Sequence, residues 1–217
     1  MAHIEIKGIS AGCESKLVLD NLSLNFELNK CYSIIGPGGS GKTTLFNIIT
    51  SNVNKDIMWV KGDVRVQVEN VFSLPQSSPF QDFEALKEYM YIPKFIEKEN
   101  PLWDKINAYK NQEIDKIPKG IRKYLAINQF EQGKKNIYLL DEPEVFNHDT
   151  IESLIDLIQK MKKSGIVLVS THHIGLAEAV GDDIVFLRYG QLLFSDTLQE
   201  FIDSKKEEII DVRIYGC

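Results

Sequence analysis

The sequence is poor in cysteine and has no long apolar run. Three cysteines in 217 residues are too few and too widely spaced for a disulfide framework or a zinc site, which favours a reducing compartment. No apolar stretch approaches the roughly 20 residues that a membrane-spanning helix needs. The opening MAHIEIKGIS lacks the apolar core of a signal peptide. We therefore expect a chain that reaches a membrane only through a partner.

An excess of positive charge is also missing. The 25 Lys and Arg residues face 31 Asp and Glu residues, for a net charge of −6, which argues against a broad nucleic-acid-binding face. The length is sufficient for one large domain with its own core. No repeat, low-complexity tract or linker divides the chain, so we expect a single domain over residues 1–217.

The most informative segment is glycine-rich, residues 36–44, GPGGSGKTT. It lies between an apolar strand at 31–35 and an apolar helix that starts near Lys42, the context that a G-x-x-x-x-G-K-[ST] phosphate loop requires. Its glycines allow backbone N–H groups to form a concave nest, and the helix adds its positive end. Lys42 should reach the β- and γ-phosphates, and the Thr43 hydroxyl should bind Mg²⁺. The predicted nucleotide-binding residues are Gly36, Pro37, Gly38, Gly39, Ser40, Gly41, Lys42, Thr43 and Thr44.

Two carboxylates follow the apolar strand at 136–140. In an open α/β sheet, ligands bind at the carboxyl ends of the strands. Asp141 is suited to hold Mg²⁺, usually through water, and Glu142 to activate an attacking water as general base. Two acids at a strand end can also be ordinary solvated charges. The upstream phosphate loop favours the catalytic alternative, because that loop requires a metal-binding partner.

Two further polar residues follow strands. His172 comes after the strand at 166–170 and is a candidate for contact with the γ-phosphate, although a lone histidine at a strand end is more often structural. Gln76 follows the strand at 71–74, and its amide oxygen is a candidate ligand of the metal and of the attacking water.

Strands alternate with helices along most of the chain, which predicts an α/β fold with a mainly parallel sheet and some antiparallel strands near the N-terminus. The expected strands are 3–9, 18–26, 31–35, 62–68, 71–74, 136–140, 166–170, 183–187, 191–194 and 208–214. The expected helices are 42–51, 121–132, 150–163, 174–180 and 197–202. The strands at 62–68 and 71–74 flank a tight turn and are expected to form a short hairpin.

Residues 77–132 are expected to form a small helical subdomain, broken into short pieces by Pro93 and Pro101. The segment is rich in aromatic residues: Phe80, Phe83, Tyr89, Tyr91, Phe95, Trp103 and Tyr109. Two interpretations remain open. The aromatics form a local core, or some of them line a docking groove for a partner helix.

Together these motifs resemble the ATP-binding-cassette (ABC) ATPase family over nearly the whole chain. The phosphate loop GPGGSGKTT, Gln76 in LPQSSPF, the acids in IYLLDEP, His172 in VSTHH and the closing IVFLRYGQLLFSDTLQEF occur in family order. The resemblance implies a P-loop NTPase core with an antiparallel β subdomain and a small helical subdomain. It assigns catalytic roles to Lys42, Gln76, Glu142 and His172, and metal contacts to Thr43, Gln76 and Asp141.

The resemblance also implies an ATPase that uses ATP and Mg²⁺. Family members pair head to tail with a second ATPase subunit, and most energise an integral-membrane transporter subunit from its cytoplasmic face. A homodimer and a heterodimer both remain open. The alternative is a soluble cassette ATPase acting on DNA or ribosomes, which the short length and acidic balance disfavour. A P-loop kinase or GTPase is a third possibility, but Asn54-Lys55-Asp56 is followed by Ile57, so a guanine-specifying N-K-x-D is not evident.

The chain departs from the family pattern at the signature motif, normally LSGGQ. The corresponding residues 117–121 read Ile-Pro-Lys-Gly-Ile. Pro118 takes the place of the serine that contacts the γ-phosphate of the opposite subunit, and it has neither hydroxyl nor N–H. Pro118 still suits the start of a helix whose positive end faces an anion. We therefore expect this signature segment to contact the ATP of the opposite subunit weakly. Two explanations remain open: sequence drift in a divergent but working ATPase, or one chain of a heterodimer with unequal sites.

The aromatic residue on which the family stacks adenine is also missing. Its position falls near Cys13, and no Phe, Tyr or Trp precedes Phe26. Stacking of a base on an aromatic contributes ~1–3 kcal/mol in single-strand nucleic-acid binders, so nucleotide affinity or base selectivity is expected to be reduced. The D-loop is unusual as well, because its aspartate matches either His148 or Asp149.

Overall fold

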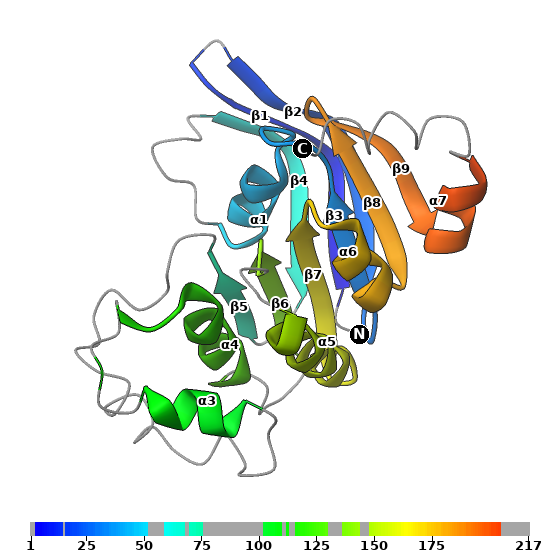
Figure 1. Cartoon of the computed structure of the whole chain (residues 1–217). Helices are drawn as coiled ribbons and strands as arrows, with labels where there is room; N and C mark the ends of the chain where they lie inside the picture. The colour runs from blue at the N-terminus through cyan, green and yellow to red at the C-terminus, as the bar shows by residue number, and fades with distance from the viewer. Residues whose placement is uncertain are drawn as a thin grey trace.

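The computed structural model describes residues 3–14, 16–51, 59–67, 70–75, 102–109, 112, 116–129, 136–143 and 148–204. Its strands form two sheets, and its helices surround the larger one (Figure 1). The strands are β1 (His3–Cys13), β2 (Lys16–Glu27), β3 (Cys31–Ile35), β4 (Trp59–Gln67), β5 (Asn70–Leu74), β6 (Asn136–Asp141), β7 (Gly165–Thr171), β8 (Asp183–Arg188) and β9 (Gln191–Thr197). The helices are α1 (Lys42–Ile49), α3 (Trp103–Ala108), α4 (Lys119–Gln129), α5 (His148–Lys162), α6 (Ile174–Val180) and α7 (Leu198–Ser204).

The larger sheet has the strand order β5-β6-β7-β3-β8-β9. Strands β5, β6, β7, β3 and β8 run parallel to one another, and only β9 is antiparallel to its neighbour. The smaller sheet, β2-β1-β4, is antiparallel throughout. This arrangement confirms the predicted α/β fold. It also brings the carboxyl ends of β3, β6 and β7 to one edge of the parallel sheet.

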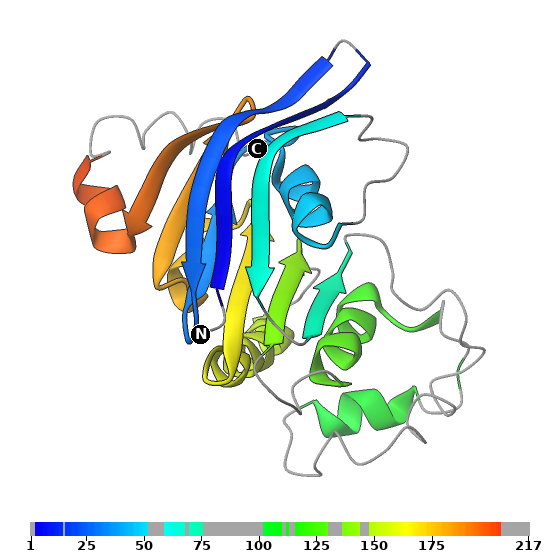
Figure 2. The ribbon, with the colours of Figure 1, turned by 180° about the vertical axis from the view of Figure 1, so that it is seen from behind.

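The parallel strands are buried on both faces, as their continuous apolar sequences predict. In β6, Ile137 and Leu139 pack with α1 and the antiparallel sheet, whereas Tyr138 and Leu140 pack with α4, α5 and α6. The larger sheet therefore lies between an antiparallel layer and a helical layer. Figure 2 shows the antiparallel layer in front of the parallel strands.

The prediction that strands 62–68 and 71–74 form a hairpin is wrong. β4 pairs with β1 in the small sheet, whereas β5 pairs in parallel with β6 in the large one. The sequence shows two short strands with a turn between them, but the core into which each strand buries its apolar side chains decides which strand it pairs with. Val64 and Val66 of β4 pack against the core between the two sheets, whereas Leu74 of β5 is buried in the core on the helical side of the large sheet.

The described part of the predicted helical subdomain consists of α3, α4 and the short segments beside them. Leu102, Ile106, Ile117 and Ile121 are buried there, and Tyr109 packs against the same core. Tyr109 therefore fits the local-core interpretation. The aromatic residues from Phe80 to Phe95 lie outside the described residues. The predicted strand at 208–214 and much of the predicted subdomain at 77–132 also lie outside them. Among the described helices, none combines the length and apolar composition needed to cross a bilayer.

Candidate functional site

The glycine-rich segment connects β3, a central strand of the parallel sheet, to α1. Lys42 is only 6% exposed, and its ammonium group donates to the carbonyl oxygens of Gly36 (2.8 Å) and Pro37 (3.1 Å) at the start of the loop. The Ser40 N–H donates to the same Pro37 carbonyl. The loop therefore closes on itself around a buried positive charge, as an anion-binding site requires.

The start of α1 leaves backbone donors for a ligand. Gly41, with φ 102°, precedes the helix, and no side chain caps its first turn. A Cβ at Gly41 would lie 2.4 Å from Leu19 Cδ2, so only glycine fits there. The N–H groups of the first turn have no intrahelical acceptor. Nearby, the buried Ser40 hydroxyl has no hydrogen-bond partner among the described residues. These unsatisfied donors fit a polyphosphate.

The two halves of the predicted site meet at Thr43 and Asp141. The Thr43 hydroxyl donates to the Asp141 carboxylate at 2.8 Å, across 98 residues of sequence. Asp141 is 4% exposed, and its other oxygen accepts from the Ser170 hydroxyl of β7. A hydroxyl beside a buried carboxylate is a donor set that suits Mg²⁺, whose remaining ligands are usually phosphate oxygens and waters. Within the described ranges, no cluster of three or more His, Cys, Asp or Glu side chains forms an all-protein metal cage.

Glu142 follows Asp141 in a left-handed backbone conformation, with φ 45°. Its N–H donates to the carbonyl oxygen and to the hydroxyl of Ser170, at 3.1 Å each. Its own carbonyl accepts from the ammonium group of Lys123 in α4. The side chain is 25% exposed, so its carboxylate is accessible to water while its backbone is held on two sides.

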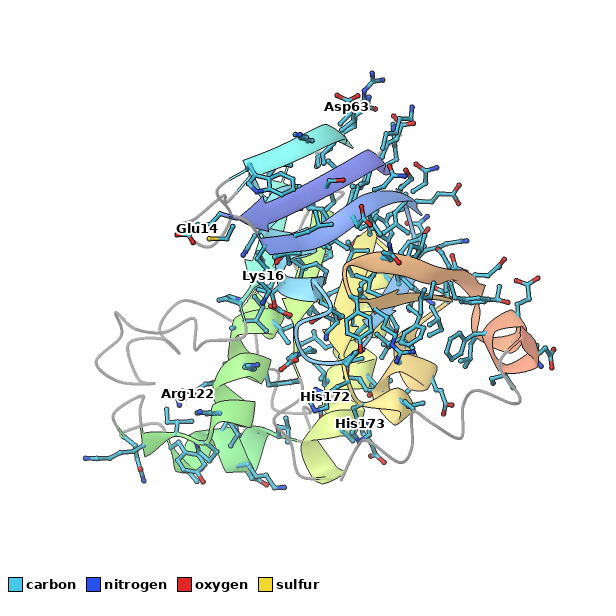
Figure 3. All side chains as sticks on the ribbon, turned by 90° about the horizontal axis from the view of Figure 1, so that it is seen from above. Glu14, Lys16, Asp63, Arg122, His172 and His173 are labelled. Atoms are coloured by element: carbon cyan, nitrogen blue, oxygen red, sulfur yellow. The ribbon has the colours of Figure 1, made fainter. Side chains whose placement is uncertain are left out.

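The two adjacent histidines occupy different environments (Figure 3). His172 is 68% exposed, and its Nδ1 lies 3.7 Å from Glu142 Oε1. His173 caps α6, because its Nδ1 accepts from the N–H of Leu176 at 3.2 Å. The structure therefore brings His172, and not His173, beside the carboxylate of the predicted base.

The segment that corresponds to the signature motif leads into α4, as predicted. Pro118 immediately precedes the helix, and its carbonyl accepts from the N–H of Arg122 at 3.1 Å. Pro118 and Lys119 are exposed, whereas Gly120 and Ile121 are buried. The helix begins at Lys119, two residues earlier than expected, because a proline is well tolerated at a helix start. A positive helix end and the Lys119 side chain therefore lie at the surface.

No aromatic from β1 lies at the expected adenine position near Cys13. Trp59 of β4 pairs with Gly12, the residue before Cys13. Its indole N–H donates to the Glu14 carbonyl at 3.3 Å. A Cβ at Gly12 would lie 2.8 Å from the Trp59 ring. Neighbouring residues of a strand face opposite sides, so Trp59 lies on the same face of the sheet as Gly12 and on the face opposite to Cys13.

Two residues of this site, Ser170 and Lys123, were not predicted from the sequence. Ser170 is a polar residue at the end of the buried apolar strand β7, which was a usable signal. Lys123 is a lysine on the buried face of α4, and the sequence alone does not show that this lysine is buried. Gln76 and the D-loop residues 144–147 lie outside the described residues, and nothing is described of the side chains of His148 and Asp149.

Comparisons with known proteins show the family and the fold. A family model described as ABC transporter matches residues 19–145, more than half of the chain. The phosphate import ATP-binding protein PstB of Thermotoga maritima is 23% identical over 245 residues, covering 98% of this chain and 97% of that protein. The glucosylceramide transporter ABCA12 of Homo sapiens is 26% identical over 212 residues, covering 87% of this chain, which spans 8% of that protein's length.

A solved structure of the ATP-binding subunit of an ABC transporter is similar in fold. It superposes with a TM-score of 0.74 and 18% identity, and the match covers 97% of this chain and 98% of that one. The phosphate loop after β3, the carboxylate pair at the end of β6 in the same sheet and a family match that spans both lead to one conclusion: the chain belongs to the ABC transporter family, as an ATP-binding cassette ATPase.

Proposed function

We propose that Mg²⁺-ATP binds over residues 36–44 and is hydrolysed with Glu142 as general base. The observation that carries this proposal is the 2.8 Å contact between Thr43 and Asp141, which brings the phosphate loop and the carboxylate pair to one point. When bound, Mg²⁺ would neutralise charge on the β- and γ-phosphates from a position held by the oxygens of Thr43 and Asp141. Gln76 is proposed as a further contact to the metal and the water.

The chemical step is an in-line displacement. Glu142 accepts a proton from water while the water oxygen forms a bond to the γ-phosphorus. The bond from this phosphorus to the bridging oxygen breaks, and its electron pair leaves with ADP. Lys42 and the N–H groups of the loop stabilise the charge on the transferring phosphoryl group. His172, which lies beside Glu142, is proposed to orient the water or to contact the γ-phosphate.

We infer that this hydrolysis energises an integral-membrane transporter subunit, with the chain peripheral on the cytoplasmic face. PstB, similar to this chain over 97% of its own length, carries the name of an import ATP-binding protein. A second cassette subunit, identical or different, would close over the ATP and present its own signature segment. Closure on ATP and opening after hydrolysis would then move the membrane partner.

The test of this role is purification of the tagged full-length chain from detergent-solubilised membranes of its own cells. We expect an integral-membrane chain to co-purify, and we expect DNA and ribosomal RNA to leave the ATPase rate unchanged. Recovery without any membrane protein, together with hydrolysis stimulated by nucleic acid, would favour the soluble alternative.

The weakened signature gives a separate prediction. Replacing Pro118 with serine adds the hydroxyl that the family places on the γ-phosphate of the opposite subunit. A hydrogen bond to a charged group contributes ~1.5–3 kcal/mol, so the ATPase rate of the purified assembly should rise by about tenfold or more. Pro118→Ala is the matched control, because it removes the proline ring without adding a hydroxyl. Equal rates in the parent and in Pro118→Ser would count against a weakened signature.

A further inference from the structure

Lys123 is a charged side chain in a buried position. It lies on α4 among Tyr124, Leu125 and Ala126, and it is 4% exposed. A buried ammonium group is costly unless its N–H groups find acceptors. One acceptor is the backbone carbonyl oxygen of Glu142, which lies at the carboxyl end of a different element, β6. A residue of the helical layer therefore contacts the backbone of the proposed base directly.

The backbone of Glu142 needs such support. Its φ of 45° lies in the left-handed region, which residues other than glycine rarely adopt. Glu142 also precedes Pro143, and a following proline favours an extended conformation with negative φ. Such a conformation persists only where surrounding contacts enforce it. Here Ser170 holds the N–H of Glu142, and Lys123 holds its carbonyl.

The direction of the Glu142 side chain depends on these two contacts. The φ angle sets where Cβ points, and the carboxylate of Glu142 then lies beside His172. If the peptide carbonyl were released, the backbone could relax toward the extended region and the carboxylate would move with it. A misplacement of about 1 Å at a catalytic group can reduce the rate about 10²-fold. Lys123 lies far from the phosphate loop in sequence, and its ammonium group donates to the Glu142 carbonyl.

We propose that Lys123 is a positioning residue for ATP hydrolysis, which holds the Glu142 carbonyl and thereby aims the catalytic carboxylate. Lys123 lies one helical turn after Lys119, in the helix that starts at the signature segment. The orientation of the base therefore depends on the position of that helix. This inference rests on the proposed role of Glu142 as general base.

The test compares the purified full-length chain with Lys123→Met, which keeps the length and apolar stem of the side chain and removes its donors. We expect kcat for ATP to fall at least about tenfold, while the Kd for ATP, measured by calorimetry, stays within about twofold because the phosphate loop is untouched. Lys123→Arg, which keeps the charge and the N–H donors, should recover at least about a third of the parental kcat. A purely structural role would lower kcat and ATP affinity together.

Two further variants complete the design. Lys162→Met is the matched control. Lys162 is also a helix lysine with a polar contact, to Asp182 at 3.0 Å, but it lies on α5. The kcat of this variant should stay within about twofold of the parent. If Lys123→Met does not remain folded, Lys123→Gln takes its place under the same criteria, since its amide is too short to reach the carbonyl in the same way. Parental kcat in a folded Lys123 variant without the ammonium, or a parallel loss of ATP affinity, would overturn the inference. Parental kcat in Glu142→Gln would instead overturn the proposed base.

Discussion

Replacing Glu142 with glutamine should lower the rate of ATP hydrolysis by about 10²–10⁴-fold, the range that a general base contributes. Glutamine has nearly the same shape but cannot accept a proton from water. The contacts of the Glu142 backbone to Ser170 and Lys123 do not involve the carboxylate, so the loop and the strand end should keep their positions. We expect ATP to remain bound and, when two cassettes close over it, a dimer that persists in size-exclusion chromatography with Mg²⁺-ATP.

The matched control is Glu178→Gln, the same chemical change at an exposed position on α6. Its kcat should equal that of the parent, because a surface carboxylate outside the site has no part in proton transfer. Hydrolysis by Glu142→Gln at the parental rate would show that another group activates the water. The measurement is steady-state phosphate release at saturating ATP, combined with single-turnover assays.

Replacing Lys42 with methionine should have the second large effect, on binding rather than on chemistry alone. The buried ammonium group now donates to the carbonyls of Gly36 and Pro37, and in the complex it would donate to phosphate oxygens. A hydrogen bond to a charged group contributes ~1.5–3 kcal/mol, so the Kd for ATP should rise by about 10- to 150-fold. Isothermal titration calorimetry measures this change directly.

Lys61→Met is a suitable control for that experiment, because Lys61 is an exposed lysine on β4. Its ATP affinity should be unchanged. The melting temperature of each variant must also be compared, since Lys42 contributes two hydrogen bonds to the loop. An unchanged ATP affinity in a folded Lys42→Met variant would mean that the nucleotide lies elsewhere.

Much of the fold follows from local sequence. The strands β3, β6 and β7 are short, mainly apolar runs, and such runs are typical of parallel strands buried on both faces. All three carry site residues at the same end, because parallel strands place their carboxyl ends at one sheet edge. The sequence therefore predicted the contact between the loop that follows β3 and Asp141, which the structure confirms through Thr43.

Other features depend on tertiary packing that local sequence does not encode. Two short strands with a turn between them suggested a hairpin, yet β4 and β5 belong to different sheets. The left-handed backbone of Glu142 is not favoured by its own residue type or by Pro143, and contacts from β7 and α4 enforce it. Lys123 would be taken for a surface residue from its charge alone, since lysine is rarely buried.

In the proposed complex, the phosphate loop and the carboxylate pair hold one nucleotide between them. The most direct test is a crystal structure of the Glu142→Gln variant grown with ATP and Mg²⁺. We predict the γ-phosphate within about 2.7–3.2 Å of Lys42 Nζ, and the metal next to the oxygens of Thr43 and Asp141. Triphosphate bound away from residues 36–44, or a metal remote from Asp141, would show that the nucleotide site lies elsewhere.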